Sequence, residues 1–342
     1  MEISVFDENK YIYSIIDVDD KFVLVNNLYH HDKYRIIVTD FKGYIRSIDL
    51  DDWENIIAVN SIRFLQKLDG NRIFINSMSE ETINFLKSEN INVVAPPDMF
   101  RLHLQRRIDQ KKLKYDDNHL REYLIQTLWI YGEYFVSFQQ KWQCRNITQN
   151  TYTGNDQLKI VLHSYTGETV KEILIQDITN GENIEIPYLH NYVCCENIFS
   201  GKINDRLFVV DIKKGSITKF LLKNDHYIIQ DINALGEVIL SFRRNLIVLK
   251  STDNGIEVLL NTEYKGFIKA ARFNHSNDLV IFSSRKIRSF KKHDLQPLRD
   301  LDTHKIYLNK TLIMNDGRML LCYSAYNKYR KEYSTKTKVI EI

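Results

Sequence analysis

The sequence predicts an all-β protein, a β-propeller formed by a single domain over residues 1–342. The first observation is a unit of four short strands that recurs along the chain. The second is an aromatic content of 12%, with 20 Tyr and 17 Phe, because aromatic side chains favour strands over helices. The third is an N-terminal strand with no hairpin partner nearby. Seven units fit a blade period of roughly 40–50 residues, with six or eight blades as alternatives.

The unit at residues 267–302 shows the pattern most clearly. Residues 267–273 alternate between apolar and polar side chains, whereas 279–283 form a near-continuous apolar run. Such a run is typical of a strand that is covered on both faces. Residues 286–290 alternate again, and 297–301 follow a polar turn. Four strands joined by three turns form one blade in outline.

Six other units follow a similar order. The second is expected to contain strands at residues 62–68, 72–76, 83–86 and 91–95. A turn that contains glycine joins the third and fourth strands in several units, at Gly43, Gly167, Gly215 and Gly255.

The two ends of the chain complement each other. The last unit, which starts at residue 307, lacks a fourth strand, and residues 1–7 form a strand without a partner. A propeller closes its ring by pairing the N-terminal strand into the last blade, because this leaves no sheet edge open. We therefore expect residues 1–7 to complete the last blade.

This pattern resembles the WD40-like propellers over nearly the whole chain. The likeness lies in the order of strands and turns, and the residues 275–278 (His-Ser-Asn-Asp) resemble the turn that precedes a strand in such repeats. The units carry neither the terminal Trp-Asp dipeptide nor the Gly-His opening of those repeats. The resemblance implies a propeller fold, and no functional residue is carried over from it.

Composition narrows the classes of partner. The chain has 47 basic and 44 acidic residues and a formal charge of +3, so neither nucleic acid nor an anionic membrane is expected as the main partner. The four cysteines lack metal-ligand spacing, and Cys194 and Cys195 in one strand would point to opposite faces. The N-terminus does not read as a signal peptide, and no apolar run is long enough to span a membrane. We expect a cytoplasmic protein without a cofactor.

A basic segment at residues 98–125 interrupts the repeat between the second and third blades. It is expected to be a partly helical insertion, and its cations form the best candidate surface for a partner: Arg101, Arg106, Arg107, Lys111 and Lys112. Long loops in compact domains are uncommon and often functional, although a solvated loop or helix is the simpler interpretation. The aromatic stretch that follows includes Trp129 and Trp142, which are either contact anchors or core residues.

Signatures of chemistry are weak. Residues 30–32 (His-His-Asp) lack metal-ligand spacing, and the acidic groups at 17–20 and 49–52 lack the calcium-loop pattern. The chain contains no G-x-S-x-G, G-x-G-x-x-G or H-E-x-x-H motif. The leading hypothesis is therefore a non-enzymatic platform that binds another protein. One specific version is an immunity or antitoxin-type protein that neutralises a partner by occluding its site. The alternatives are a hydrolase or lyase-type enzyme with a site in the central channel and an RNA-binding propeller.

Overall fold

The computed structural model describes residues 2–3, 10–28, 33–40, 42, 44–50, 65–68, 70–75, 79–96, 123–141, 145–146, 151–152, 158–175, 192–203, 205–274, 276–283, 286–291, 297–302, 306–313, 318–327 and 332–341. By contacts the chain divides into two compact units. The first comprises Met1–Lys112, Thr127–Ile130 and His304–Ile342, and the second comprises Leu113–Gln126 and Tyr131–Thr303.

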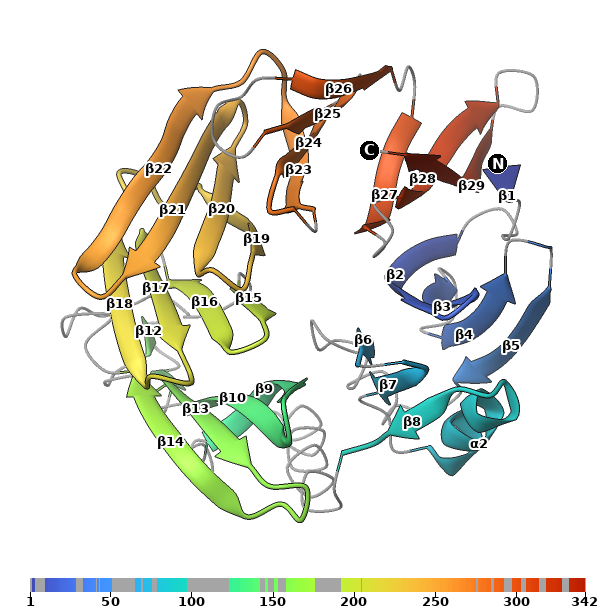
Figure 1. The fold of residues 1–342 in the computed structure, drawn as a ribbon, viewed down its shortest axis with the longest axis horizontal. Helices are drawn as coiled ribbons and strands as arrows, with labels where there is room; N and C mark the ends of the chain where they lie inside the picture. The colour runs from blue at the N-terminus through green and yellow to red at the C-terminus, as the bar shows by residue number, and fades with distance from the viewer. Residues whose placement is uncertain are drawn as a thin grey trace. The chain divides into compact units, whose positions relative to one another are not determined.

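The first unit contains two four-stranded antiparallel sheets (Figure 1). One has the order β1-β29-β28-β27, with β1 at Glu2–Ile3, β27 at Ile306–Ile313, β28 at Arg318–Asn327 and β29 at Glu332–Glu341. The other is a meander of β2 (Lys10–Val18), β3 (Lys21–Leu28), β4 (Lys33–Asp40) and β5 (Ile45–Leu50). Glu2 pairs with Lys338 and Ile3 with Thr337, so the N-terminal strand completes the last blade, as predicted.

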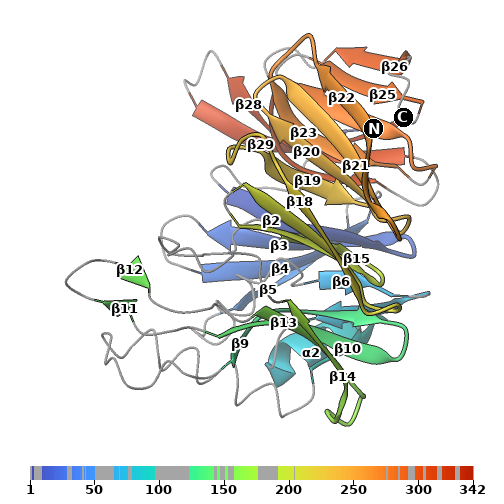
Figure 2. The same ribbon diagram turned by 90° about the vertical axis from the view of Figure 1, so that its left-hand side faces the viewer.

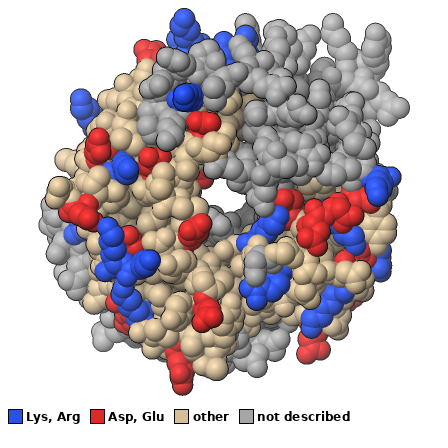
Figure 3. Space-filling model, in the orientation of Figure 1, with Lys and Arg blue, Asp and Glu red and all other residues tan. Residues whose placement is uncertain are grey.

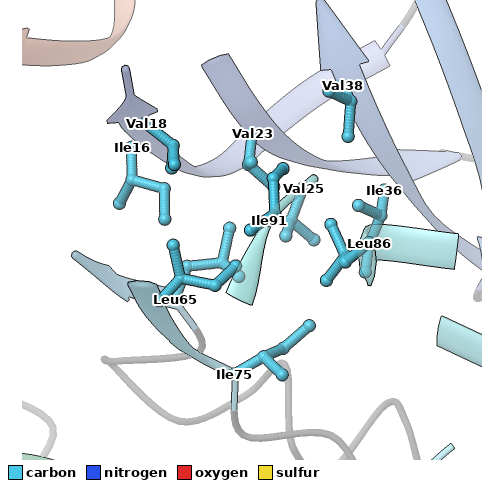
Figure 4. Packing of buried hydrophobic residues seen from close by; sticks show 11 residues of the cluster. Ile16, Val18, Val23, Val25, Ile36, Val38, Leu65, Ile75, Leu86 and Ile91 are labelled. Atoms are coloured by element: carbon cyan, nitrogen blue, oxygen red, sulfur yellow. The ribbon is translucent and has the colours of Figure 1, made fainter. Parts of the chain in front are cut away.

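A smaller sheet follows in the same unit. It contains β6 (Leu65–Lys67), β7 (Arg72–Ile75) and β8 (Asn92–Val94), and helix α2 (Glu80–Ser88) connects β7 to β8. Strands β7 and β8 are parallel, which a tight hairpin cannot achieve, so the helix serves as the crossover. Helix α2 and this sheet pack on the β2–β5 sheet through one apolar cluster, in which Leu86 and Ile91 meet Val23, Val25 and Ile36 (Figure 4).

Four further sheets are each four-stranded and antiparallel. Their strands are, sheet by sheet, β9 (Tyr123–Tyr131), β10 (Tyr134–Lys141), β13 (Leu158–His163) and β14 (Thr169–Ile175); β15 (Tyr192–Cys195), β16 (Ile198–Ile203), β17 (Arg206–Asp211) and β18 (Ser216–Leu221); β19 (Ile228–Ile232), β20 (Glu237–Phe242), β21 (Asn245–Thr252) and β22 (Gly255–Glu263); β23 (Ile268–Phe273), β24 (Leu279–Ser283), β25 (Lys286–Phe290) and β26 (Pro297–Asp302). A two-stranded ribbon, β11 (Arg145–Asn146) and β12 (Thr151–Tyr152), lies between β10 and β13 in the sequence.

Successive sheets of the second unit pack face to face. The first strands β15, β19 and β23 contact one another in that order (Figure 1), and Figure 2 turns the last strands β14, β18 and β22 toward the viewer. Strand β20 shows why the sequence favours this arrangement. Val238 and Leu240 enter the apolar cluster shared with the β15–β18 sheet, whereas Ile239 between them enters the cluster shared with the β23–β26 sheet. Because side chains alternate across a strand, an unbroken apolar run supplies both interfaces.

These blades confirm the predicted propeller class, but the blade count differs from the prediction. The described residues form six four-stranded blades, not seven. The exception is the second of the seven sequence repeats, which starts at residue 62: the strand expected there at residues 83–86 belongs to helix α2. Ser79 caps this helix by accepting from the backbone N–H of Thr82, and Thr82 and Leu86, one turn apart, are its buried residues.

The C-terminal end of the insertion predicted at residues 98–125 also differs from the structure. Residues 123–125 begin strand β9 rather than ending an insertion, and the remainder of 98–125 lies outside the described residues. In the described part of the chain, no helix has the length and apolar character needed to cross a membrane.

Candidate functional site

The most unusual surface of the second unit begins at the turn between β20 and β21. Phe242 pairs with Asn245, so Arg243 and Arg244 form a two-residue hairpin loop. Arg243 has a φ of 55°, in the left-handed region. Such loops favour Gly, which has no β-carbon, and Asn or Asp, whose short side chains hydrogen-bond to the local backbone, whereas a long side chain such as Arg costs about 1 kcal/mol or more in this region. Turn chemistry therefore does not explain two consecutive arginines here.

The chain between β22 and β23 lies against this turn. The N–H of Ile268 donates to the carbonyl oxygen of Arg243 at 2.8 Å, and the N–H of Tyr264 donates to that of Arg244 at 2.8 Å. Tyr264 and Ile268 are buried, while Lys265 and Phe267 between them are exposed, Phe267 to 54%. The two hydrogen bonds and two buried side chains thus hold a cation and an aromatic ring beside the arginines.

The ring of Phe242 packs against the side chain of Arg243. The Cζ atom of Arg243 lies 5.1 Å from the centroid of the Phe242 ring, within the range of a cation–π contact. The ring of His226 lies against the same phenyl ring, with centroids 5.1 Å apart and planes at 32°. Phe242 itself packs on the apolar cluster between the β15–β18 and β19–β22 sheets. One position of the guanidinium is therefore favoured by packing.

We call this group the Arg243 surface. It has three exposed cations and one exposed aromatic side chain beside the partly buried Phe242: Phe242, Arg243, Arg244, Lys265 and Phe267. Among the described residues, no carboxylate forms an ion pair with any of the three cations, whereas Lys159 pairs with Glu172 and Lys214 with Asp253. Within the described part of the chain, the positive charge of this surface is therefore not paired with a carboxylate.

A serine–histidine pair occurs in the β10–β13 region but does not form an accessible nucleophile. The Oγ of Ser137 lies 3.0 Å from Nε2 of His163 and accepts a hydrogen bond from Nε2 of Gln139 at 2.7 Å. Ser137 is fully buried, and His163 is 3% exposed. A catalytic serine needs contact with substrate, so we interpret this group as a polar network within a blade.

A buried carboxylate joins helix α2 to the β2–β5 sheet. Glu89, whose side chain is 1% exposed, accepts hydrogen bonds from Tyr44 at 2.7 Å, Arg46 at 2.7 Å and Lys21 at 3.3 Å. Burial alone would raise the pKa of Glu89, but the hydrogen bonds from Tyr44 and Lys21 and the charges of Lys21 and Arg46 outweigh it. The pKa therefore lies below the usual value of 4.5. Since all four groups satisfy one another, this network stabilises the first unit.

Metal ligands do not converge in the described residues, in which no group of three or more His, Cys, Asp or Glu side chains could hold an ion. Asp17, from one of the acidic groups considered in the sequence, instead pairs with Lys67 at 3.1 Å. The His-His-Asp group at residues 30–32 lies outside the described residues. Cys194 is buried and Cys195 partly buried, and no disulfide joins them, as their alternation in β15 predicts.

Of the partner-binding residues predicted from the sequence, only Trp129 can be placed. It is 1% exposed in β9, so it belongs to the core and offers no surface for a partner. The other predicted residues lie outside the described part of the chain: Arg101, Arg106, Arg107, Lys111, Lys112 and Trp142. Sequence reasoning did not single out the Arg243 surface. The signal that could have found it is the Arg-Arg pair in a position where a small turn residue is expected.

Comparisons with known proteins support the fold. The sequence matches no protein-family model and no curated protein. Among solved structures, the acylaminoacyl peptidase of Pyrococcus horikoshii is similar over 96% of this chain and 51% of its own, with 8% identity and a TM-score of 0.51. The chain thus spans about half of that enzyme. The AfRom2 CNH domain is similar over 99% of this chain and 98% of its own, with 10% identity and a TM-score of 0.47.

A third similar structure is the WD40 domain of Pan2 from Neurospora crassa, with 8% identity and a TM-score of 0.38 over 66% of this chain and 69% of that domain. At these identities a likeness concerns the fold alone. The sheet topology defines the protein as a β-propeller, and the TM-score of 0.51 to the peptidase is consistent with this fold.

Proposed function

We propose that the protein is a non-enzymatic platform that binds another protein through the Arg243 surface. β-Propellers commonly mediate protein–protein interactions. The observation that carries the proposal is the cluster of exposed cations and the exposed ring of Phe267 at the strained Arg243 turn. Arg and aromatic residues are enriched among the side chains that dominate binding energy at protein interfaces. The hydrogen bonds to Tyr264 and Ile268 hold this cluster rigid, which lowers the entropy lost on binding.

Affinity purification of the tagged protein from its native lysate tests the proposal, with nuclease treatment and mass spectrometry. The variants Arg244→Ser and Phe267→Ser are compared with Lys213→Ala, which changes an exposed lysine outside the surface. We expect one stoichiometric protein that the wild type and Lys213→Ala retain and that both surface variants lose. Equal recovery by all four proteins would refute this role of the surface.

The basic insertion at residues 98–125 remains a second proposed contact region for the same partner. Charge reversal of Arg106, Arg107, Lys111 and Lys112 to Glu tests it, because a contact with an acidic partner would then become repulsive. Retention of the partner by this variant would rule the insertion out.

A narrower form of the proposal is an immunity or antitoxin-type protein that covers a partner's active site. Its test is the activity of the captured partner with and without the protein. We also propose that the protein acts in the cytoplasm, where thiols such as those of Cys194 and Cys195 stay reduced. Cell fractionation checks this location.

A further inference from the structure

We propose that the Arg243 surface recognises an acidic segment of a partner protein, in which carboxylates flank an aromatic side chain. This inference rests on the proposed function and specifies the chemistry of the same surface. It combines three properties of the surface: cations that pair with no carboxylate among the described residues, the exposed ring of Phe267, and limited extent.

The charge argues for an anionic ligand. Arg243 and Arg244 are consecutive, and the backbone hydrogen bonds of the turn place Lys265 next to them. All three side chains are exposed, and in the described part of the chain none of them pairs with a carboxylate. Three like charges on adjacent segments repel one another, so carboxylates that approach all three gain more than from any single pair.

The apolar side chains argue for an aromatic residue in the ligand. Phe267 is 54% exposed, and the partly buried ring of Phe242 lies against Arg243 in the adjacent turn. An aromatic side chain of a partner would contact these groups and the guanidinium face together. Aromatic pairs contribute beyond their buried area, and a cation over a ring adds to this.

The limited extent of the surface favours a peptide over nucleic acid. Glu263, exposed and opposite Asn245, and Asp225, exposed beside His226, place carboxylates at its border. On the face shown in Figure 3, basic and acidic side chains of the described residues are likewise intermixed rather than arranged as a basic stripe. A nucleic-acid backbone presents charge continuously and favours a basic stripe, whereas a peptide can confine its carboxylates to one patch.

The strain at Arg243 separates a role in binding from a role in folding. Because a φ of 55° is unfavourable for Arg and comfortable for Gly, Arg243→Gly should leave thermal stability unchanged or raise it. A residue kept for folding would show the opposite effect. We therefore expect this variant to lose ligand affinity without losing stability.

Fluorescence anisotropy tests the proposal with a labelled dodecapeptide rich in glutamate around a central phenylalanine. The comparison probes are the same peptide with serine for phenylalanine, the same peptide with glutamine for glutamate, and oligouridylate of equal length. We expect the first peptide to bind best, with affinity that falls as salt rises. Arg243→Gly, Arg244→Ser and Lys265→Ala should each weaken binding about two- to fivefold, as for exposed ion pairs. Phe267→Ser should weaken it about tenfold.

Two variants serve as matched controls. Lys213→Ala removes an exposed cation and Val258→Ala an apolar side chain that is 49% exposed, both outside the surface, and neither should change affinity. Equal affinity for all three peptides, tighter binding of oligouridylate, or no binding of any probe would overturn the proposal. Loss of the native partner by the surface variants without peptide binding would refute the ligand chemistry alone. Peptide binding with an unaltered native partner would instead refute the proposed function.

Discussion

Replacement of Glu89 by Gln tests how the first unit holds helix α2 against the β2–β5 sheet. The substitution keeps the shape of the side chain and one acceptor oxygen, but it removes the charge that Lys21 and Arg46 neutralise. The side chains of Lys21 and Arg46 are 24% and 52% exposed, so water compensates much of the loss at Arg46. A charged hydrogen bond contributes about 1.5–3 kcal/mol when shielded and below about 1 kcal/mol when exposed.

From these contributions we expect Glu89→Gln to lower the free energy of unfolding at pH 7 by about 2 kcal/mol. With an unfolding entropy of about 2.1 cal/mol/K per residue, that corresponds to roughly 3 °C in melting temperature for a chain of 342 residues. Urea unfolding followed by circular dichroism provides the measurement. Glu133→Gln, which changes an exposed glutamate in the turn between β9 and β10, is the control and should shift neither quantity.

The pH dependence gives a second test of the same network. The pKa of Glu89 in the folded protein lies below the unfolded value of 4.5, so its contribution is present above 4.5 and is lost as the pH falls through the folded pKa. The stability difference between the wild type and Glu89→Gln should therefore narrow below pH 4.5. Equal urea midpoints at pH 7, or a difference that widens in acid, would refute the reasoning.

Three further predictions concern the blades. Leu240→Ala, at a fully buried site between two sheets, should lower the free energy of unfolding in urea by about 2–5 kcal/mol. Leu221→Ala, at a site 65% exposed, should lower it by under about 0.5 kcal/mol. Similar decreases for the two variants would contradict the placement of Leu240 in the core. Gly132 has a φ of 57°, and the space that a β-carbon would occupy there is open. Gly132→Ala should therefore lower the free energy of unfolding by about 1 kcal/mol through backbone strain alone, and Gly132→Asn should lower it by less. Melting temperatures of the two variants provide the measurement. Burial lowers the pKa of Lys202 from 10.5, although the charges of Asp225 and Asp205 act in the opposite direction. The free energy of unfolding should therefore rise with pH between the lowered pKa and 10.5. If a Lys202→Met variant shows the same rise, Lys202 is not its cause.

The sequence predicts the blades well because their second strands carry an unambiguous pattern. The apolar run covers residues 238–240 in β20 and 279–282 in β24, and all of these residues are buried, which favours apolar side chains at successive positions. The N-terminal strand was equally predictable, since a blade with three strands and a strand without a partner can complete each other.

The sequence predicts the wrong element where a short group of apolar residues is compatible both with the two-residue period of a strand and with the 3.6-residue period of a helix. Ile83, Phe85 and Leu86 resemble a short strand, but only Leu86 of these is fully buried, together with Thr82 one helical turn earlier. The cap at Ser79 and the acidic residues Glu80 and Glu81 mark a helix start, and Asn90, with a φ of 59°, ends it. These local signals, rather than hydrophobicity, distinguish the helix from a strand.

The candidate site was harder to predict, because the overall composition shows almost no excess of cations that would indicate a basic surface. The chain as a whole has nearly equal numbers of cations and anions, and only the fold brings Lys265 and Phe267 beside the Arg243 turn. The pair Arg243–Arg244 is visible in the sequence, but its significance depends on knowing that the loop between β20 and β21 has two residues. That length follows from the strand register, which hydrophobic patterns define only to within a few residues.

Left-handed backbone by itself does not mark a binding site in this protein. Asp19 and Asn277 also have positive φ, at 52° and 59°, but Asp and Asn tolerate this region, and their turns need no further explanation. Glu196, at 49°, bears the same strain as Arg243 without neighbouring exposed aromatic rings in its turn. What distinguishes Arg243 is that an unfavourable backbone coincides with exposed apolar area and with a charge that no described carboxylate pairs. If binding maintains the arginine, then its replacement by Gly must move stability and affinity in opposite directions, whereas a loss of both would assign Arg243 to folding.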